Sequence, residues 1–292
     1  MGDSAIHHVS DTAFMVAHCR ALESQRRDAL FHDPLAARLA GDRGKAIIEA
    51  FPTARMTTWM VAIRTVVIDE LIRALLPRGI DTVLNLGAGL DTRPYRLDVP
   101  KDLNWVEVDY PHVIEFKRER LQREQPRCQL RQVGLDLADS RALQEFLAEA
   151  NGRAKRLLVL TEGVVPYLDV GQVGLLADDL RALTRLDSWI VDYLSKESHR
   201  HRERAGVTRH MRQAPFKFQP DDWFAFFAEH GFKVGQLRYL AERGDELGRH
   251  APLPLRYRLL ISLLRRLTPP SKRGGFQKFA GYAVLEPERS VN

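Results

Sequence analysis

The feature of this 292-residue sequence that most constrains its fold is an alternation of short apolar runs with amphipathic segments, which begins near residue 81. The runs are typical of strands buried on both faces, and the segments between them have helical spacing. Because repeated strand–helix units build such a rhythm, the sequence predicts an α/β fold with a mostly parallel, doubly wound sheet. The predicted strands cover 81–87, 104–110, 129–137, 155–163 and 188–194, and the predicted helices cover 112–124, 140–150 and 169–183.

The two ends of the chain depart from this alternation. The first eighty residues predict helices over 11–27, 33–41 and 57–76. Near the other end, two predicted strands, 233–240 and 277–287, enclose a long basic stretch, and we expect them to form an antiparallel pair.

We therefore expect a single domain over residues 1–292 rather than two separable ones. Its expected parts are an N-terminal helical cap (1–80), a core (81–240), a lid insertion (241–276) and a final strand (277–287).

Composition narrows the class of protein. The net charge is +6, but 44 Lys and Arg are interleaved with 38 Asp and Glu, which disfavours a nucleic-acid partner and suits an acidic small substrate. No apolar run approaches the roughly 20 residues that span a bilayer, so no membrane association is expected. The N-terminus lacks the pattern of a secretory signal and the chain has two cysteines, so we expect a reducing cytoplasm.

The stretch "LNLGAGLDTRPYRL" (84–97) is the most specific motif. Gly87, Ala88 and Gly89 follow a predicted strand, and glycines there let the backbone approach a phosphate or nucleoside closely. The dinucleotide fingerprint wants a third glycine where this chain has Thr92, which weakens an NAD interpretation. A tight turn without a ligand is the alternative.

Acids at the ends of the next strands favour a ligand. Asp109 lies twenty residues beyond Gly89, followed by Tyr110, and its carboxylate can accept hydrogen bonds from both ribose hydroxyls. Asp136 ends the third predicted strand, where it can accept from the exocyclic amine of adenine while the Leu137 amide faces a ring nitrogen. Ordinary solvated acids are the alternative, but together the positions predict an adenosine-containing ligand.

Three further residues are candidates for the reacting end. Glu162 ends the fourth predicted strand, at the edge where open α/β sheets bind ligands, and can contact the cofactor or the reacting group. Tyr167 follows within one loop and can point its phenol at a substrate. Arg64 lies in an amphipathic helix and, if buried, needs an anionic partner; otherwise it is a surface arginine. No histidine or cysteine pattern predicts a metal site, and no catalytic residue is assigned.

Three motifs in this order, "LNLGAGLDTRPYRL", "VEVDYPHVIEFKRERL" and "LTEGVVPYL", resemble the leucine carboxyl methyltransferase family. The closer similarity is to its bacterial branch of O-methyltransferases linked to polyketide biosynthesis, and it covers most of residues 11–195. The resemblance implies a class I fold that binds S-adenosylmethionine (SAM), with a seven-stranded sheet whose last strand is antiparallel.

The resemblance also implies roles for the candidate residues. It places Gly87–Gly89 under the methionine and ribose, Asp109 at the ribose hydroxyls, Asp136 and Leu137 at adenine, Glu162 near the methionine end, and Arg64 at the methionine carboxylate. The chain departs from members that modify a phosphatase, because Ala138 stands where they carry an arginine that faces the terminal carboxylate of their substrate. A small metabolite is therefore the expected acceptor.

The expected activity is SAM-dependent O-methylation of a carboxylate or hydroxyl, with S-adenosylhomocysteine (SAH) as product. A carboxylate acceptor is ionised near pH 7 and needs no general base. Two alternatives remain open from the sequence: an NAD(P)-dependent oxidoreductase and a non-catalytic SAM-binding protein. The oligomeric state is not predicted.

Overall fold

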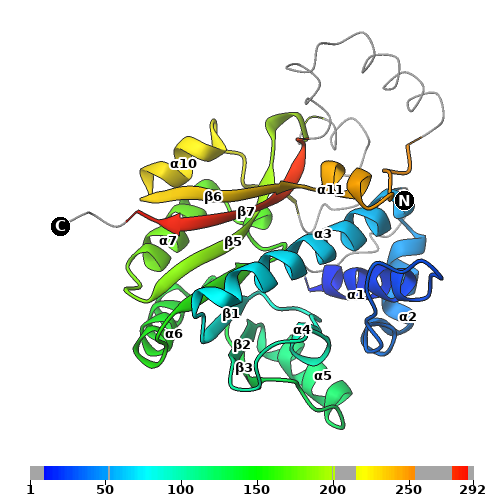
Figure 1. Ribbon diagram of the computed structural model, residues 1–292, viewed down its shortest axis with the longest axis horizontal. Coiled ribbons are helices and arrows are strands. Elements are labelled where there is room, and N and C mark those ends of the chain that lie inside the picture. The colour runs from blue at the N-terminus through cyan, green and yellow to red at the C-terminus, as the bar shows by residue number, and fades with distance from the viewer. Residues whose placement is uncertain (1–9, 52, 199, 201–214, 254–277, 289–292) are drawn as a thin grey trace.

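The computed structural model describes residues 10–51, 53–198, 200, 215–253 and 278–288 (Figure 1). Within them, seven strands form one sheet in the order β3-β2-β1-β4-β5-β7-β6. The strands are β1 (Thr82–Leu86), β2 (Asn104–Asp109), β3 (Gln129–Gly134), β4 (Leu157–Thr161), β5 (Leu186–Leu194), β6 (Phe232–Tyr239) and β7 (Ala280–Pro287). The helices are α1 (Asp11–Ser24), α2 (Ala36–Glu49), α3 (Ala54–Leu75), α4 (Arg93–Arg96), α5 (Pro111–Leu121), α6 (Ser140–Arg153), α7 (Val170–Arg181), α10 (Trp223–Glu229) and α11 (Leu240–Glu246), with 3-10 turns η1 (Leu76–Arg78) and η2 (Val165–Tyr167).

The direction of strand pairing confirms the expected fold class. Strands β1 to β5 pair in parallel, and β7 lies between β5 and β6 and is antiparallel to both. Every residue of β1 and β4, the central strands, is buried, because helices cover both faces of a parallel sheet. The expected late pair of antiparallel strands is β6 with β7.

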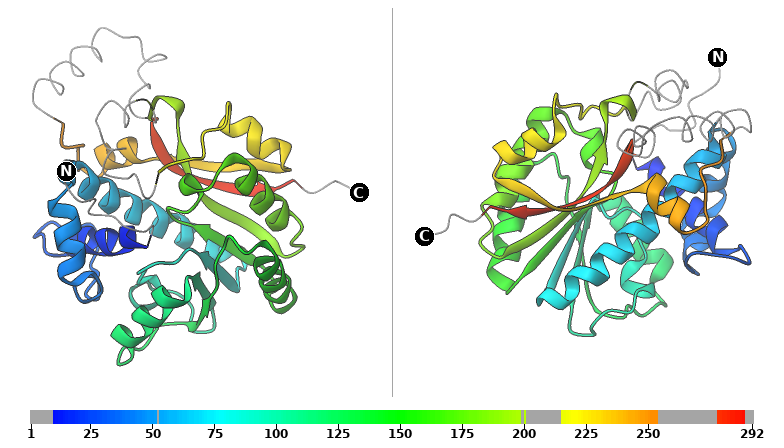
Figure 2. Two further views of the ribbon diagram at one scale, coloured as in Figure 1. Left: turned by 180° about the vertical axis from the view of Figure 1, so that it is seen from behind. Right: turned by 45° about the horizontal axis from the view of Figure 1, so that its top comes forward.

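Helices cover both faces of the sheet (Figures 1 and 2), and an apolar core lies on each face. One core joins the sheet to α6, α7 and α10 through side chains such as Leu147, Leu176 and Phe227. The other joins it to α3 and α11 through side chains such as Ile68 and Leu240. Alternate residues of each buried strand serve the two cores, since successive side chains point to opposite faces.

The N-terminal helices confirm a helical segment but correct one of its boundaries. The predicted helix over 33–41 is wrong in extent, because α2 runs on to Glu49 across a kink at Gly41. Gly41 has φ +52° and ψ −162°, a conformation that interrupts the helix without ending it. The helix resumes because Ile47 and Ile48 pack into an apolar cluster with α1 and α3.

The start of the predicted lid insertion packs against α3. The Arg243 guanidinium on α11 forms an ion pair with Glu70, at 2.6 Å between Nη2 and Oε1. Farther on, the Arg249 carbonyl oxygen accepts a hydrogen bond of 2.7 Å from the Trp59 indole. The remainder of the predicted lid, 254–276, lies outside the described residues.

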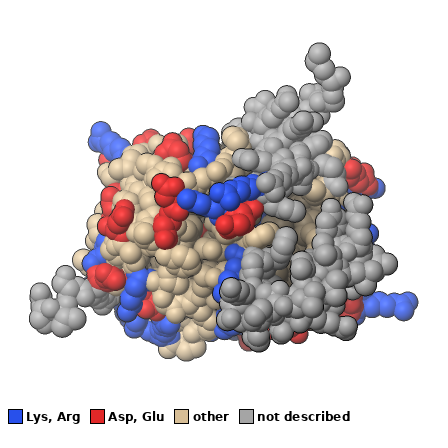
Figure 3. All heavy atoms as spheres, turned by 90° about the horizontal axis from the view of Figure 1, so that it is seen from above, with Lys and Arg blue, Asp and Glu red and all other residues tan. Residues whose placement is uncertain are grey.

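Three observations on the described residues concern membrane-spanning helices, metal-binding groups and surface charge. Among the described helices, none combines the length and apolar character of a membrane span. The described residues also contain no group of three or more His, Cys, Asp or Glu arranged to hold a metal ion. On the face in Figure 3, basic and acidic side chains lie side by side over the described surface.

Two glycines with positive φ allow the effect of backbone strain on stability to be separated from that of a steric collision. Gly87 lies in the turn after β1, and Gly79 lies before β1. Gly87 has φ +70°, and a Cβ there would lie 2.3 Å from Cγ2 of Val164. Gly79 has φ +87°, but a Cβ there would meet nothing within 4 Å. We expect Gly79→Ala to lower the free energy of unfolding by about 1–2 kcal/mol from backbone strain alone, and Gly87→Ala to lower it by clearly more.

Urea denaturation of both variants measures the difference. Val164→Ala, added to Gly87→Ala, should recover part of the extra loss because it removes the colliding methyl groups. Equal losses for the two single variants would show that the turn is not closely packed against Val164.

Candidate functional site

The glycine turn brings bare backbone to the carboxyl edge of the sheet. The amides of Gly87 and Ala88 donate to the Val108 carbonyl oxygen of β2, at 2.8 and 3.0 Å. Gly89 also has positive φ, +49°, and a Cβ there would lie 3.2 Å from Cβ of Ala13 on α1. The turn is therefore pinned to β2 on one side and covered by the N-terminal cap on the other.

Asp109 lies directly beside this turn, as the sequence predicts. Its carboxylate accepts hydrogen bonds from the Gly89 amide at 2.6 Å and the Tyr110 amide at 2.7 Å. Burial raises the pKa of Asp109, and the two amides offset part of that effect. Each carboxylate oxygen has a second lone pair, so the group can still accept hydrogen bonds from a ligand.

The other predicted adenosine contacts gather at the same edge. Burial raises the pKa of the Tyr110 phenol, and the negative charges of Asp136 and Asp109 raise it further. Asp136 is exposed, and its Oδ1 accepts a hydrogen bond from the Ala138 amide at 2.9 Å. A Leu137 methyl lies 3.8 Å from the position of a Cβ on Gly87. The structure thus brings the sequence-predicted group of residues 87–89, 109, 110, 136 and 137 together.

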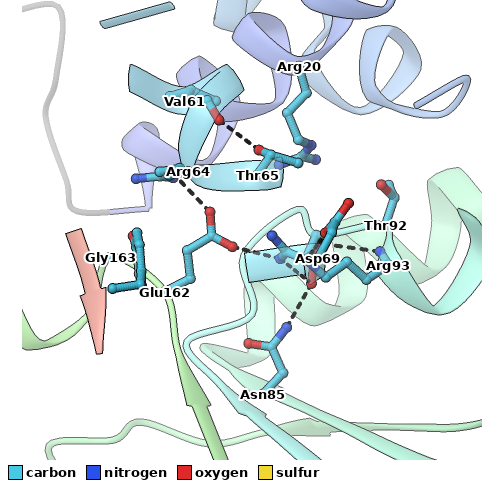
Figure 4. A network of polar contacts seen from close by, with 12 residues as sticks. Arg20, Val61, Arg64, Thr65, Asp69, Asn85, Thr92, Arg93, Glu162 and Gly163 are labelled. Carbon is cyan, nitrogen blue, oxygen red and sulfur yellow. Dashed lines mark hydrogen bonds and ion pairs between the residues drawn. The ribbon is translucent and has the colours of Figure 1, made fainter. Parts of the chain in front are cut away.

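Glu162, at the end of β4, is held between two arginines (Figure 4). Its Oε2 accepts a hydrogen bond of 2.6 Å from Nη1 of Arg93, and its Oε1 lies 3.0 Å from Nε of Arg64. Burial opposes ionisation, but Arg93 and Arg64 outweigh it and lower the pKa of Glu162. Arg64 is therefore half-buried, with a side chain 19% exposed, and has an anionic partner.

One Arg64 atom remains unsatisfied. Its Nε is buried and donates no hydrogen bond of good geometry, although Glu162 is close enough for an ion pair. Burial by itself lowers the pKa of the guanidinium, while Glu162, Tyr282 and Asp192 raise it above its ordinary value. A fixed cation with an unused donor is suited to an anionic ligand group.

Arg93, which the sequence analysis left without a role, organises this region. Besides Glu162, its guanidinium contacts Asp69 of α3 at 2.7 Å and Asp91 at 3.1 Å. Asn85 of β1 donates to Asp91 at 2.9 Å, so the network spans α3, α4, β1 and β4. A signal was present in "LDTRPYRL", where Asp91 stands two residues before Arg93, but the partners Asp69 and Glu162 are distant in the sequence.

Thr92 shows why a third glycine is absent. The side chain is fully buried, and its hydroxyl donates to Asp33 Oδ2 at 2.6 Å. Arg20 of α1 binds the same Asp33 oxygen at 2.8 Å and also the Leu90 carbonyl. The position that a dinucleotide site keeps bare is used here to attach the cap to the turn.

Tyr167 lies at the end of η2, next to the site. Its ring packs edge-to-face on Phe216, with centroids 5.0 Å apart. Both rings border an apolar cluster of the cap that includes Met15, Phe51 and Val61. An apolar wall therefore stands beside the residues that follow β4.

Comparisons with known proteins bear on the identity of this site. The family model for leucine carboxyl methyltransferase matches residues 13–180. A proposed S-adenosyl-L-methionine-dependent methyltransferase of Mycobacteroides abscessus is 35% identical over 72% of this chain and 73% of its own length. A second such protein, from Streptomyces avermitilis, is 31% identical over 83% of this chain and 89% of its own length.

Solved structures support the fold. A proposed methyltransferase from Thermobifida fusca superposes with a TM-score of 0.60 at 13% identity, covering 98% of this chain and 97% of that one. At this identity the likeness concerns the fold alone, and it agrees with the sheet order. The family match covers the cap and most of the core, including every candidate site residue. The chain therefore belongs to the leucine carboxyl methyltransferase family and is a methyltransferase.

Proposed function

We propose that the protein transfers the methyl group of SAM to an oxygen atom of a small metabolite, either a carboxylate or a hydroxyl. SAM is the methyl donor named for its relatives and SAH is the product. The observation that carries the proposal is the row of groups along the carboxyl edge of the sheet, with a bare glycine turn, the Asp109 carboxylate beside it and the Arg64–Glu162 pair beyond.

The residues fit the proposed cofactor. Gly87 and Gly89 carry no side chain and have positive φ, +70° and +49°, so the backbone of this turn would lie close under the methionine and ribose. Asp109 would accept hydrogen bonds from the ribose hydroxyls. The Arg64 guanidinium, whose Nε faces Glu162 without a hydrogen bond, would pair with the methionine carboxylate.

Residues that follow β2 and β3 complete the proposed binding site for the nucleoside. Asp136 and Leu137 would face the adenine, and Tyr110 would lie against the nucleoside. Glu162 would sit near the methionine end, where its charge is fixed by Arg93.

The chemistry asks little of the protein beyond placement. SAM brings a methyl group already activated by its sulfonium. The chain's own residues have to hold that end rigidly, bring the acceptor oxygen into line and exclude water. The Arg93 network supplies the rigidity, because its three charged partners come from α3, the turn after β1 and the end of β4.

The acceptor is proposed to be a small, partly apolar molecule, with polyketide-like acids among the candidates. Tyr167 and Phe216 offer an aromatic wall beside the site, and Tyr167 would orient the substrate. Ala138 supplies no cation for a peptide carboxylate. We place the activity in the cytoplasm, since both cysteines are free and buried.

Cofactor binding is tested at Asp109. Asp109→Asn should weaken SAH binding about tenfold or more, because a charged acceptor for the ribose hydroxyls is lost. Isothermal titration calorimetry measures this, with the exposed Asp98→Asn as a matched control expected to stay within about twofold of wild type. Equal affinity of the two variants would remove Asp109 from the site.

The acceptor class is tested by transfer of a labelled methyl group from SAM to a panel of small carboxylic acids, phenols and a peptide ending in leucine. A carboxylate acceptor predicts a rate that is flat above about pH 6, whereas a phenol predicts a rate that rises towards its pKa of about 10. Preference for the peptide would contradict a small-metabolite acceptor. No transfer to any acceptor, despite SAH binding, would support a non-catalytic role.

A further inference from the structure

A buried acid and a buried phenol lie behind the Arg64–Glu162 pair. Asp192 of β5 is 9% exposed and Tyr282 of β7 is 3% exposed, and the two residues are direct cross-strand partners. The Tyr282 hydroxyl donates to Asp192 Oδ1 at 2.8 Å. The sequence analysis assigned no role to either residue.

The same carboxylate holds the backbone that follows Glu162. The Gly163 amide donates to both Asp192 oxygens, at 3.0 and 3.2 Å. Gly163 has φ +68°, and a Cβ there would lie 3.8 Å from Nη1 of Arg64. Asp192 thus fixes the turn at Gly163. Glu162 precedes this turn and Arg64 lies close to it in space, and both are proposed contacts of the methionine end.

Strand alternation puts these groups on one face. Leu160 of β4 and Ile190 of β5 belong to the core under α3, and two residues onward each strand reaches Glu162 and Asp192. Tyr282 belongs to the same core. Arg64 enters from α3 above them, and the Asp192 and Tyr282 groups both raise the pKa of its guanidinium against the effect of burial.

Keeping a carboxylate here costs stability. Burial raises the pKa of Asp192 to about 6, although the Tyr282 hydroxyl, Arg64 and the Gly163 amide all lower it. An apolar residue in the strand would avoid this cost. The presence of an acid at residue 192 is better explained by its hydrogen bonds to the Gly163 amide and the Tyr282 hydroxyl.

We propose that Asp192 and Tyr282 are positioning residues for the methionine end of the cofactor. Tyr282 holds the Asp192 carboxylate, and that carboxylate holds the Gly163 amide. The turn fixed in this way sets the position of Glu162, and Glu162 in turn orients Arg64 towards the ligand. This inference rests on the proposed function, which places the methionine carboxylate at Arg64. Neither residue needs to touch the ligand.

Two probes separate positioning from a general structural role. SAH carries the amino-acid end, whereas 5′-methylthioadenosine shares the adenosine and sulfur but lacks that end. Asp192→Asn and Tyr282→Phe should each weaken SAH binding, by about tenfold and about fivefold, and leave methylthioadenosine within about twofold of wild type. Tyr193→Phe, which removes a hydroxyl from the opposite face of the same strand, should change neither affinity.

The pH dependence of binding provides a second readout. Below pH 6 Asp192 gains a proton, and the neutral carboxyl group, with one oxygen now a donor, accepts more weakly from Gly163 and Tyr282. The ratio of SAH to methylthioadenosine affinity should therefore fall in wild type between pH 7.5 and pH 5.5 and stay flat in Asp192→Asn. Asp109 titrates as well, but it faces the ribose common to both probes and cancels in the ratio. Glu162 stays ionised because its pKa is lowered, and Arg64 stays charged.

Arg64→Ala distinguishes failure of the inference from failure of the proposed function. If Arg64→Ala loses the preference for SAH while Asp192→Asn and Tyr282→Phe keep it, the positioning role is overturned and the placement of the cofactor stands. If Arg64→Ala also keeps the preference, both are overturned. If Asp192→Asn binds neither probe because its fold is lost, the milder Tyr282→Phe decides.

Discussion

The ion pair network centred on Arg93 is the interaction on which the site depends. A guanidinium buried to 2% exposure is surrounded by Asp69, Asp91 and Glu162, which come from α3, the turn after β1 and the end of β4. Burial lowers the pKa of this arginine, and its acidic partners raise it well above the ordinary value. Removing one member would leave uncompensated buried charge, so each element holds the others at fixed distances.

The network links two functions that the fold has to combine. Its Glu162 branch reaches Arg64 and the end of the site assigned to methionine, while the neighbouring Thr92–Asp33–Arg20 contacts attach the cap to the glycine turn. The cap is therefore part of the site and not an appendage. Membership of a methyltransferase family, together with a buried Thr92 where a dinucleotide site keeps glycine, removes the NAD(P) oxidoreductase alternative.

Most of the sheet and half of the site were predictable from the sequence because their signals are local. Buried parallel strands appear as apolar runs, and carboxyl ends of parallel strands meet at one edge, so Asp109 and Glu162 were placed without tertiary information. The partners of Arg93 and the Asp192–Tyr282 pair were not predictable. Apart from Asp91, which is two residues from Arg93, they join positions 24 to 90 residues apart, and no short-range pattern tells which buried charge meets which. The extent of α2 was wrong for a related reason, since packing of Ile47 and Ile48 overrode the signal of Gly41.

The central claim, that the carboxyl edge holds SAM between Asp109 and the Arg64–Glu162 pair, is tested most directly by a crystal structure of the complex with SAH. We expect ribose hydroxyls within hydrogen-bond distance of the Asp109 carboxylate, the sulfur above Gly87–Gly89 and the amino-acid carboxylate on Arg64. Ligand bound elsewhere, or with its amino-acid end turned away from Arg64, would contradict it.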